Sequence, residues 1–154
     1  MIEHMGFEKQ NRRPAQSYGK MGHVLINGED CRCASEAEAK WLEHISPALR
    51  SGDIVEFTWQ PPGSPLHYKY DKQDCTDVYR PDAIIRWKDG DEWVIEIKRG
   101  RLEQKAASKI KRFCQQYPDR KLVLVWFGRL PSKGPAHTRL NHIRPWIDHI
   151  WEMK

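Results

Sequence analysis

The sequence contains no apolar run that approaches the roughly 18 residues needed to span a bilayer. It also contains no evident internal repeat or low-complexity stretch. With 154 residues, of which 39% are hydrophobic, the chain is long enough to build one globular core. These absences exclude a membrane-spanning helix and predict a soluble globular protein.

Cysteine is scarce, and the four present are Cys31, Cys33, Cys75 and Cys114. A chain of this length does not need disulfides to stabilise its core, so we expect reduced thiols, as in cytosolic proteins. The Cys31-x-Cys33 spacing is not that of a usual zinc knuckle, although a zinc site that uses Cys75 or one of the seven histidines is an alternative.

The first 14 residues (MIEHMGFEKQNRRP) lack the apolar stretch of a secretory signal, which also favours a cytoplasmic protein. Residues 1–20 are polar, and we expect them to form an arm that is mobile or bound by a partner. Residues 21–154 are expected to form a single domain.

Two segments near the middle of the chain predict a β-hairpin. Residues 80–87 (RPDAIIRW) and 91–98 (DEWVIEIK) are rich in β-branched and aromatic residues, and Lys88-Asp89-Gly90 between them is a turn signal. A three-residue loop with Gly90 in the left-handed conformation would place Asp82 opposite Glu96. A two-residue Asp89-Gly90 loop would instead send Asp82 to the core side.

Alternation of side chains along a strand decides which residues share a face of this hairpin. With the three-residue loop, the Asp82/Glu96 face also carries Ile84, Arg86, Val94 and Lys98. The other face is entirely apolar and is formed by Ala83, Ile85, Trp87, Trp93, Ile95 and Ile97. We therefore predict that the hairpin buries its apolar face and leaves two carboxylates and a lysine on the other. Arg86 opposite Glu92 is expected to form a cross-strand ion pair.

The paired carboxylates suit a magnesium ion, which takes one or two protein carboxylates and completes its octahedron with waters and phosphate oxygens. Such an ion polarises a phosphodiester and lowers the pKa of a bound water, while a nearby lysine orients that water or offsets charge in the transition state. Asp82 and Glu96 are thus the predicted metal ligands, and Lys98 is the predicted water-positioning group. The alternative is that Glu96 and Lys98 form an ordinary solvated strand face.

Pro81-Asp82, Glu96 and Lys98 resemble the signature of the PD-(D/E)xK nuclease superfamily. The stretch from Ser35 to about Phe127 resembles the phage endonuclease I branch of Holliday-junction resolvases, and it is similar to the endonuclease subunit of heteromeric transposases. Three further features support the resemblance: a helix that opens with SEAEA at residues 35–39, a Gln60-Pro61 pair after a strand, and a helix followed by a hydrophobic strand after Lys98.

The resemblance implies an α/β, restriction-endonuclease-like core in which a central mixed sheet is flanked by helices. It implies an endonuclease that cleaves DNA with Mg²⁺, or with Mn²⁺, in a bacterial or phage-infected cell. It also implies that the backbone carbonyl of Ile97 is a further metal ligand and that Gln60 lies near the site, although a polar residue at a strand end explains Gln60 equally well.

Glu38 lies in a predicted helix over residues 35–50, one turn before the apolar positions Trp41 and Leu42 on the same side. The resemblance assigns this glutamate to the active site, as a further ligand or an orienting carboxylate. However, Ser35-x-x-Glu38 is also a capping box, with Ser35 as the N-cap. Both roles remain open from the sequence.

Positive charge is concentrated directly after the motif. The formal net charge is +5, and residues 98–112 (KRGRLEQKAASKIKR) hold seven basic residues against Glu103 alone. Much of this segment is predicted to be a helix with a basic face, which would bind the phosphate backbone of nucleic acid. The residues predicted to contact DNA are Arg99, Arg101, Lys105, Lys109 and Arg112. The alternative is a solvated helix face.

The remaining segments complete the expected α/β domain. Strands are predicted at residues 23–26, 54–59 and 121–127, the last buried on both faces, and residues 68–77 are expected to hold a turn between strands. Residues 128–142 are expected to be a loop. A closing helix from about Pro145 would place its two tryptophans, Trp146 and Trp151, in the core or at a homodimer contact.

The predicted function is metal-dependent hydrolysis of DNA phosphodiesters, with phage-type selectivity for branched or junction DNA. The alternative is a non-catalytic DNA-binding or phage assembly module that keeps the nuclease fold. An enzyme with an RNA substrate is a second alternative.

Overall fold

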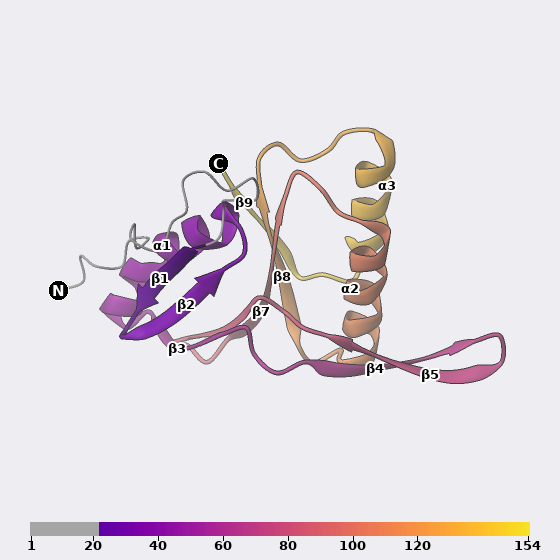
Figure 1. Cartoon of the computed structure of the whole chain (residues 1–154), viewed down its shortest axis with the longest axis horizontal. Coiled ribbons are helices and arrows are strands. Elements are labelled where there is room, and N and C mark those ends of the chain that lie inside the picture. The colour runs from indigo at the N-terminus through magenta and orange to yellow at the C-terminus, as the bar shows by residue number, and fades with distance from the viewer. Residues whose placement is uncertain (1–21) are drawn as a thin grey trace. The chain divides into compact units, whose positions relative to one another are not determined.

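The computed structural model describes residues 22–154 (Figure 1). The arm predicted for residues 1–20 lies outside the described residues. The chain divides into two compact units, of which the first ends at Val55 and the second runs from Glu56 to Lys154.

The first unit contains a β-hairpin and one long helix. Strands β1 (Gly22–Ile26) and β2 (Glu29–Cys33) pair antiparallel around the turn Asn27-Gly28, in which both residues have positive φ angles. Helix α1 (Glu36–Ser51) begins after the N-cap Ser35 and ends at Gly52, which is in the left-handed conformation. The predicted strand and helix of this region are therefore confirmed.

The second unit is organised around a five-stranded mixed sheet with the strand order β3-β6-β7-β8-β9. The strands are β3 (Ile54–Trp59), β6 (Ala83–Trp87), β7 (Glu92–Arg99), β8 (Lys121–Phe127) and β9 (His149–Met153). β6 and β7 pair antiparallel, whereas β7 pairs parallel with β8 and β8 pairs parallel with β9. Six of the seven β8 residues are buried, as predicted for a strand covered on both faces.

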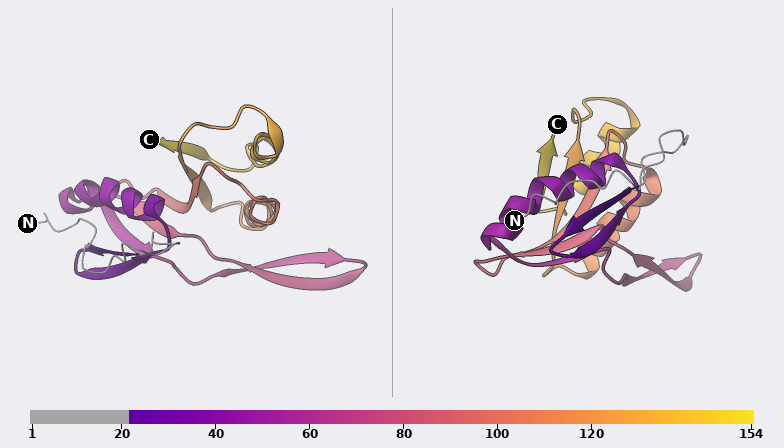
Figure 2. Two further views of the ribbon diagram at one scale, coloured as in Figure 1. Left: turned by 45° about the horizontal axis from the view of Figure 1, so that its top comes forward. Right: turned by 60° about the vertical axis from the view of Figure 1, so that its left-hand side comes forward.

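Helices α2 (Gln104–Gln116) and α3 (Gly134–Ile143) lie side by side, and the left panel of Figure 2 shows both nearly end-on. They pack through Ile110, Phe113 and Leu140 on the sheet face that carries Val94 and Trp126. The predicted α/β architecture, with a central mixed sheet flanked by helices, is confirmed.

A second hairpin projects from this unit (Figures 1 and 2). Its strands β4 (Ser64–Tyr70) and β5 (Gln73–Tyr79) pair antiparallel. The turn is Asp71-Lys72, where both residues have positive φ angles, as a tight two-residue hairpin turn requires. The prediction of a turn over residues 68–77 was too broad, because all but two of these residues are strand.

The C-terminal predictions were wrong in two places. The loop predicted for residues 128–142 contains helix α3, which buries Leu140 and Ile143. The helix predicted from Pro145 is strand β9, whose Ile150 pairs with Leu124 of β8. The apolar spacing of this short segment fits both structures, and the open edge of β8 decides between them by offering hydrogen bonds along the whole strand.

None of the helices within residues 22–154 has both the length and the apolar character needed to cross a membrane.

Candidate active site

The β6–β7 hairpin has the register that the three-residue loop predicts. The N–H of Trp87 donates to the carbonyl of Asp91 over 2.8 Å, and Gly90 has a φ angle of +94°. The ladder pairs Arg86 with Glu92 and ends with Ala83 opposite Ile95. Asp82 is the next residue of the chain beyond this last ladder pair, and its position opposite Glu96 on the same face stays a prediction.

Asp82 is held by both of its strand neighbours. Its N–H donates to the carbonyl of Ile95 over 2.9 Å, and its carbonyl accepts from the N–H of Gln60 over 2.8 Å. The carboxylate oxygen Oδ2 accepts the main-chain N–H of Ile97 over 2.7 Å. The aspartate is thus tied through both its backbone and its side chain to the strand that carries Glu96.

Gln60 follows the last residue of β3 and has a positive φ angle of +50°. Its N–H bond to Asp82 extends the contact between β3 and β6 by one residue. This contact supports the interpretation of Gln60 as a strand-end residue that helps to place Asp82. The role near the site that the resemblance implies for its side chain stays a prediction.

Glu96 is buried, with 8% of its surface exposed. Its Oε1 accepts a hydrogen bond of 2.6 Å from the hydroxyl of Tyr79, and Lys98 Nζ lies 3.3 Å from its Oε2. Burial raises the pKa of the Glu96 carboxyl, and the nearby charge of Lys98 and the Tyr79 hydrogen bond act in the opposite direction. The carboxylate is therefore held between a hydroxyl and an ammonium group.

The covering of this face differs from the prediction. We expected the carboxylate face to be left outside the core, but Val94 on the same face is fully buried and belongs to the core beneath α2. Tyr79, which closes β5, is buried against Glu96, and burial followed by the charge of Glu96 raises the pKa of its hydroxyl. The face that carries Glu96 is therefore partly covered rather than an open strand face.

A pocket of about 190 Å³ opens beside Glu96. Its lining combines apolar side chains of α2 and β5 with two cations: Val78, Tyr79, Arg80, Glu96, Ala106, Lys109 and Ile110. An anionic substrate group that enters this pocket would meet Arg80 and Lys109 while it lies next to the carboxylate. The arrangement suits a phosphodiester, since cations neutralise the phosphate and the carboxylate can share a metal with it.

Lys109 is already engaged at the pocket wall. Its Nζ donates to the carbonyl of Val78 over 3.2 Å and lies 3.4 Å from Asp77 Oδ1. A hydrogen bond from the Val78 N–H, and then the charge of Lys109, lower the pKa of Asp77. The ammonium group is thus fixed at the end of β5.

The oxygen donors predicted to bind a metal are the carboxylates of Asp82 and Glu96 and the carbonyl of Ile97. In a strand, the N–H and C=O of one residue point toward the same neighbour, and the Ile97 N–H points to Asp82. The Ile97 carbonyl therefore lies on the β6 side, beyond the last ladder pair. Two carboxylates and one carbonyl are hard oxygen ligands of the kind that Mg²⁺ accepts with waters.

Residues 22–154 contain no group of three or more His, Cys, Asp or Glu side chains arranged to hold a metal. The four cysteines are free thiols, as predicted. No such group in this part of the chain supports the alternative of a zinc site that uses Cys75 or a histidine.

Glu38 in the first unit makes the contacts of a capping box. Its Oε1 accepts the N–H of Ala34 over 2.8 Å, and its own N–H donates to Ser35 Oγ over 3.2 Å. The capping interpretation is confirmed. The catalytic role predicted for Glu38 is a separate claim, which stays a prediction.

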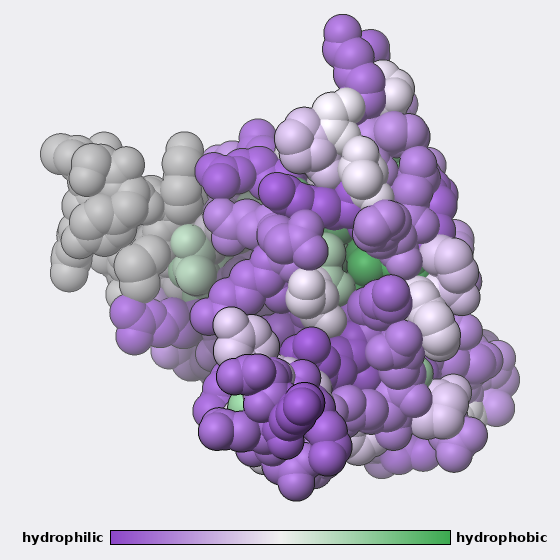
Figure 3. Space-filling view, turned by 90° about the vertical axis from the view of Figure 1, so that its right-hand side faces the viewer, coloured by the Kyte–Doolittle hydropathy of each residue, from purple (hydrophilic) through white to green (hydrophobic). Residues whose placement is uncertain are grey.

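The five residues predicted to contact DNA divide into two groups. Arg99, Arg101 and Lys105 are exposed at the end of β7 and the start of α2. Lys109 is bound at the pocket wall, and the Arg112 guanidinium lies over the ring of Tyr68, 4.1 Å from its centroid. Figure 3 shows that the face formed by α2, α3 and the projecting hairpin is mainly hydrophilic.

One predicted ion pair was wrong. Arg86 stands opposite Glu92 in the ladder, but its Nε donates to Glu56 of β3 over 2.8 Å, and Glu92 pairs with Arg120 over 3.3 Å. β3 is the outer neighbour of β6 in the sheet, so its glutamate also lies within reach of Arg86.

Tyr79 and Arg80 were not predicted as site residues. Both directly precede Pro81-Asp82, and this position was the only signal in the sequence that could have found them.

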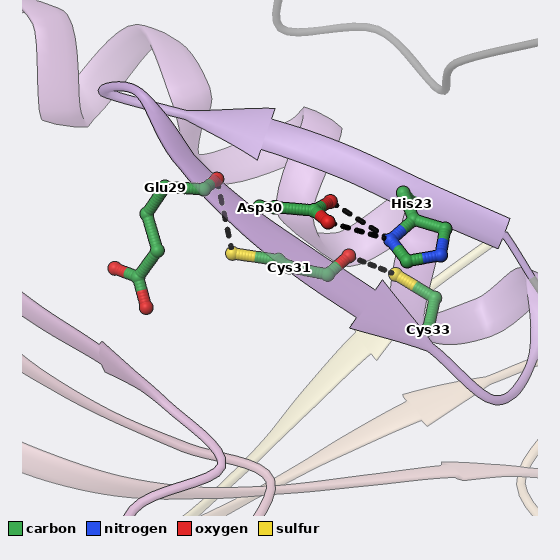
Figure 4. Close-up of polar contacts among 5 residues, drawn as sticks. All are labelled: His23, Glu29, Asp30, Cys31 and Cys33. Carbon is green, nitrogen blue, oxygen red and sulfur yellow. Dashed lines mark hydrogen bonds and ion pairs between the residues drawn. The ribbon is translucent and has the colours of Figure 1, made fainter.

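The polar contacts of the first unit form a separate group (Figure 4). His23 Nδ1 lies 2.8 Å from Asp30 Oδ1 across the β1–β2 hairpin. The Sγ of Cys33 donates to the carbonyl of Cys31 over 3.5 Å, and both thiols are buried. Burial raises the pKa of Cys31 to about 12, so this pair behaves as core rather than as reactive thiols.

Residues 18–132 match the sequence profile of a family described as "Protein of unknown function (DUF1064)". The match spans well over half of the chain. The chain belongs to the DUF1064 family. No curated protein matches this DUF1064 chain significantly.

Two solved structures are similar to the DUF1064 chain. One, "Structure of EndoMS in apo form", has 21% sequence identity and a TM-score of 0.36, with 81% of this chain and 49% of that chain covered. The other is a repair endonuclease from Pyrococcus abyssi, with 16% identity, a TM-score of 0.39, and 90% and 64% covered. The DUF1064 chain thus spans about half of the first protein and less than two thirds of the second.

Proposed function

We propose that this protein is a metal-dependent endodeoxyribonuclease that hydrolyses DNA phosphodiesters. The observation that carries the proposal is the tie of Asp82 to the strand that carries Glu96, because its carboxylate accepts the N–H of Ile97 over 2.7 Å, and Lys98 Nζ lies 3.3 Å from Glu96. The adjoining pocket adds two cations, Arg80 and Lys109, which would neutralise a phosphate that enters it.

Asp82, Glu96 and the Ile97 carbonyl would hold Mg²⁺ or Mn²⁺. A bound ion of this kind polarises the phosphodiester and lowers the pKa of a coordinated water. Lys98 then has two tasks in the proposed reaction: it orients the attacking water and it offsets negative charge on the pentacovalent transition state. The hydrogen bond from the Ile97 N–H holds the Asp82 carboxylate against the strand that carries Glu96.

The phosphate backbone would be bound by the basic residues that follow the motif. Arg99, Arg101 and Lys105 are exposed, and they follow Lys98 closely along the chain. The residues proposed to contact the DNA backbone and the proposed catalytic lysine therefore belong to one continuous segment. Such contacts give affinity that depends on salt but not on sequence.

A phage-type role, selectivity for branched or junction DNA and a homodimeric state rest on the resemblance to resolvases. Catalytic participation of Glu38 rests on the same resemblance, as does a bacterial or phage-infected cytoplasm as the setting. The biological role, the DNA selectivity, the dimeric state, the role of Glu38 and the cellular setting are therefore all parts of the proposal.

One observation favours the alternative of a non-catalytic DNA-binding or assembly module. The Glu96 carboxylate already has two partners, Tyr79 and Lys98, and it is buried. A glutamate with a purely structural role would have the same two contacts and the same burial. Metal binding separates the two functions: Mg²⁺ should raise the melting temperature of the wild type more than that of Asp82→Ala if the site binds metal.

The proposal is tested by incubating the protein with synthetic junction, flap, nicked and linear DNA, in Mg²⁺ and in EDTA. Lys98→Ala should lose cleavage, and Lys88→Ala, at the distant turn of the same hairpin, serves as the matched control. Labelled RNA duplexes in the same reactions test the RNA alternative. Cleavage that persists both in EDTA and in Lys98→Ala would contradict the mechanism.

A further inference from the structure

We propose that Tyr79 is a positioning residue for the metal site, whose hydroxyl holds the Glu96 carboxylate in the orientation that binds the ion. The inference rests on the proposed function, because it concerns the affinity of the same site. It assigns Tyr79 a role in metal binding although its side chain is not a metal ligand.

The contact between the two side chains is short and enclosed. The Tyr79 hydroxyl donates to Glu96 Oε1 over 2.6 Å, and only 4% of Tyr79 and 8% of Glu96 are exposed. A carboxylate offers about four acceptor positions on its two oxygens. One bond from Tyr79 and one contact from Lys98 therefore leave acceptor positions for a cation.

The position of the Tyr79 hydroxyl is itself fixed by three elements. Tyr79 ends β5 and pairs with Ser64 at the foot of the projecting hairpin. Its ring packs on Phe113 of α2, with 4.8 Å between centroids. Gly63 approaches the same strand end so closely that a Cβ there would lie 2.2 Å from Val78 Cγ1. The hydroxyl consequently has little freedom to leave Glu96.

The same strand end contacts the basic helix. Lys109 lies one helical turn before Phe113 and donates to the carbonyl of Val78, the residue before Tyr79. Tyr79 thus connects the helix proposed to bind DNA with the carboxylate proposed to bind metal. Because the hydroxyl donates to Glu96, its loss should change metal affinity and leave DNA affinity in EDTA unchanged.

Partners that orient metal ligands typically change metal affinity by about 10- to 100-fold when they are removed. Tyr79→Phe removes the hydroxyl and keeps the ring on Phe113. Calorimetric titration with Mn²⁺ should therefore give a dissociation constant about 10- to 100-fold weaker than that of the wild type. Asp82→Asn alters a proposed ligand directly. Its dissociation constant for Mn²⁺ shows how much affinity is lost when the metal site itself is damaged.

Tyr117→Phe is the matched control. Tyr117 also stacks on Phe113, with 5.1 Å between centroids, and its hydroxyl donates to the carbonyl of Pro65 over 2.7 Å. The control therefore loses a hydroxyl hydrogen bond in the same aromatic stack, but not the one to Glu96. It should bind Mn²⁺ as the wild type does.

Two results would overturn the inference, and they differ in what else they overturn. If Tyr79→Phe binds Mn²⁺ as tightly as the wild type or more tightly, while Asp82→Asn abolishes binding, the role of Tyr79 is excluded and the proposed function stands. If the wild type binds no Mn²⁺, both are excluded. Should the phenylalanine variant melt below the assay temperature, all variants are titrated at a lower temperature at which circular dichroism shows that each is folded.

Discussion

The Asp82 carboxylate reaches across the β6–β7 hairpin and accepts the main-chain N–H of Ile97 over 2.7 Å. This bond ties Asp82 to the strand that carries Glu96 and Lys98, so all three charged groups are positioned by one strand. A shift of the pairing by one residue would move Asp82 to the opposite face of the hairpin. The geometry of the candidate site therefore depends on the hairpin register.

Gly63→Ala should destabilise the second unit. The added Cβ would lie 2.2 Å from Val78 Cγ1 and 3.2 Å from the carbonyl oxygen of Tyr79, so the Val78 side chain or the end of β5 must shift. Overpacking of this kind costs about 1–3 kcal/mol. Urea denaturation measures the loss, with Ser64→Ala as the neighbouring control. Equal free energies of unfolding for the wild type and Gly63→Ala would show that the end of β5 accommodates the added Cβ without cost, and would contradict this prediction.

The ion pair between Asp91 and Lys121 should make stability depend on pH. Lys121 Nζ lies 2.6 Å from Asp91 Oδ1, and this bond, followed by the one from Trp93, lowers the pKa of Asp91 below its ordinary value of 3.8. A carboxyl whose pKa is lowered by folding stabilises the folded state above the unfolded pKa, and this stabilisation is lost as the pH falls through the folded pKa.

Asp91→Asn should therefore be less stable than the wild type at pH 6, and the difference should disappear as the pH falls below 3.8. Denaturant unfolding at several pH values measures this. Asp119→Asn, which alters an exposed aspartate before β8, should follow the wild-type curve. A difference that persists unchanged in acid would mean that Asp91 acts through shape rather than charge.

Lys105→Gln should weaken DNA binding equally for unrelated sequences. Lys105 is exposed in the first turn of α2, and each phosphate contact contributes about one unit to the slope of log affinity against log salt. Fluorescence anisotropy in EDTA at several salt concentrations measures that slope. Lys88→Gln should keep the wild-type slope, and an unchanged slope in Lys105→Gln would remove this residue from the DNA-binding surface.

Only one of the four thiols should react quickly in the folded protein. Burial raises the pKa of both Cys31 and Cys114 to about 12 and that of Cys33 further, whereas Cys75 is half-exposed. A colorimetric thiol reagent at pH 8 should label one cysteine rapidly and the rest only after unfolding. Cys75→Ser should lose the rapid phase; a rapid phase that survives would place a reactive thiol in the core.

The hairpin and its register could be predicted because local rules decide them. Gly90 supplies the left-handed residue that a three-residue loop needs, and this loop sets the pairing that ends with Ala83 opposite Ile95. The buried strand at residues 121–127 was equally readable, since it is apolar without interruption.

The contacts that complete the site could not be predicted, because they join residues that are distant in sequence or depend on strand order. Tyr79 reaches Glu96 across 17 positions only after β5 folds beneath α2. Arg86 pairs with Glu56 rather than with Glu92 because β3 is the outer neighbour of β6 in the sheet. The sequence alone does not give that strand order. The same limit applies to β9, where a short apolar stripe fits both a helix and a strand.

The central claim, that Asp82 and Glu96 share a divalent cation, is tested most directly by a crystal structure of the protein soaked in Mn²⁺, with anomalous diffraction measured at the manganese edge. We predict one strong anomalous peak within about 2.0–2.4 Å of a carboxylate oxygen from each residue and of the Ile97 carbonyl. Manganese bound elsewhere, with the Tyr79 and Lys98 contacts to Glu96 intact and no peak between the two carboxylates, would contradict it.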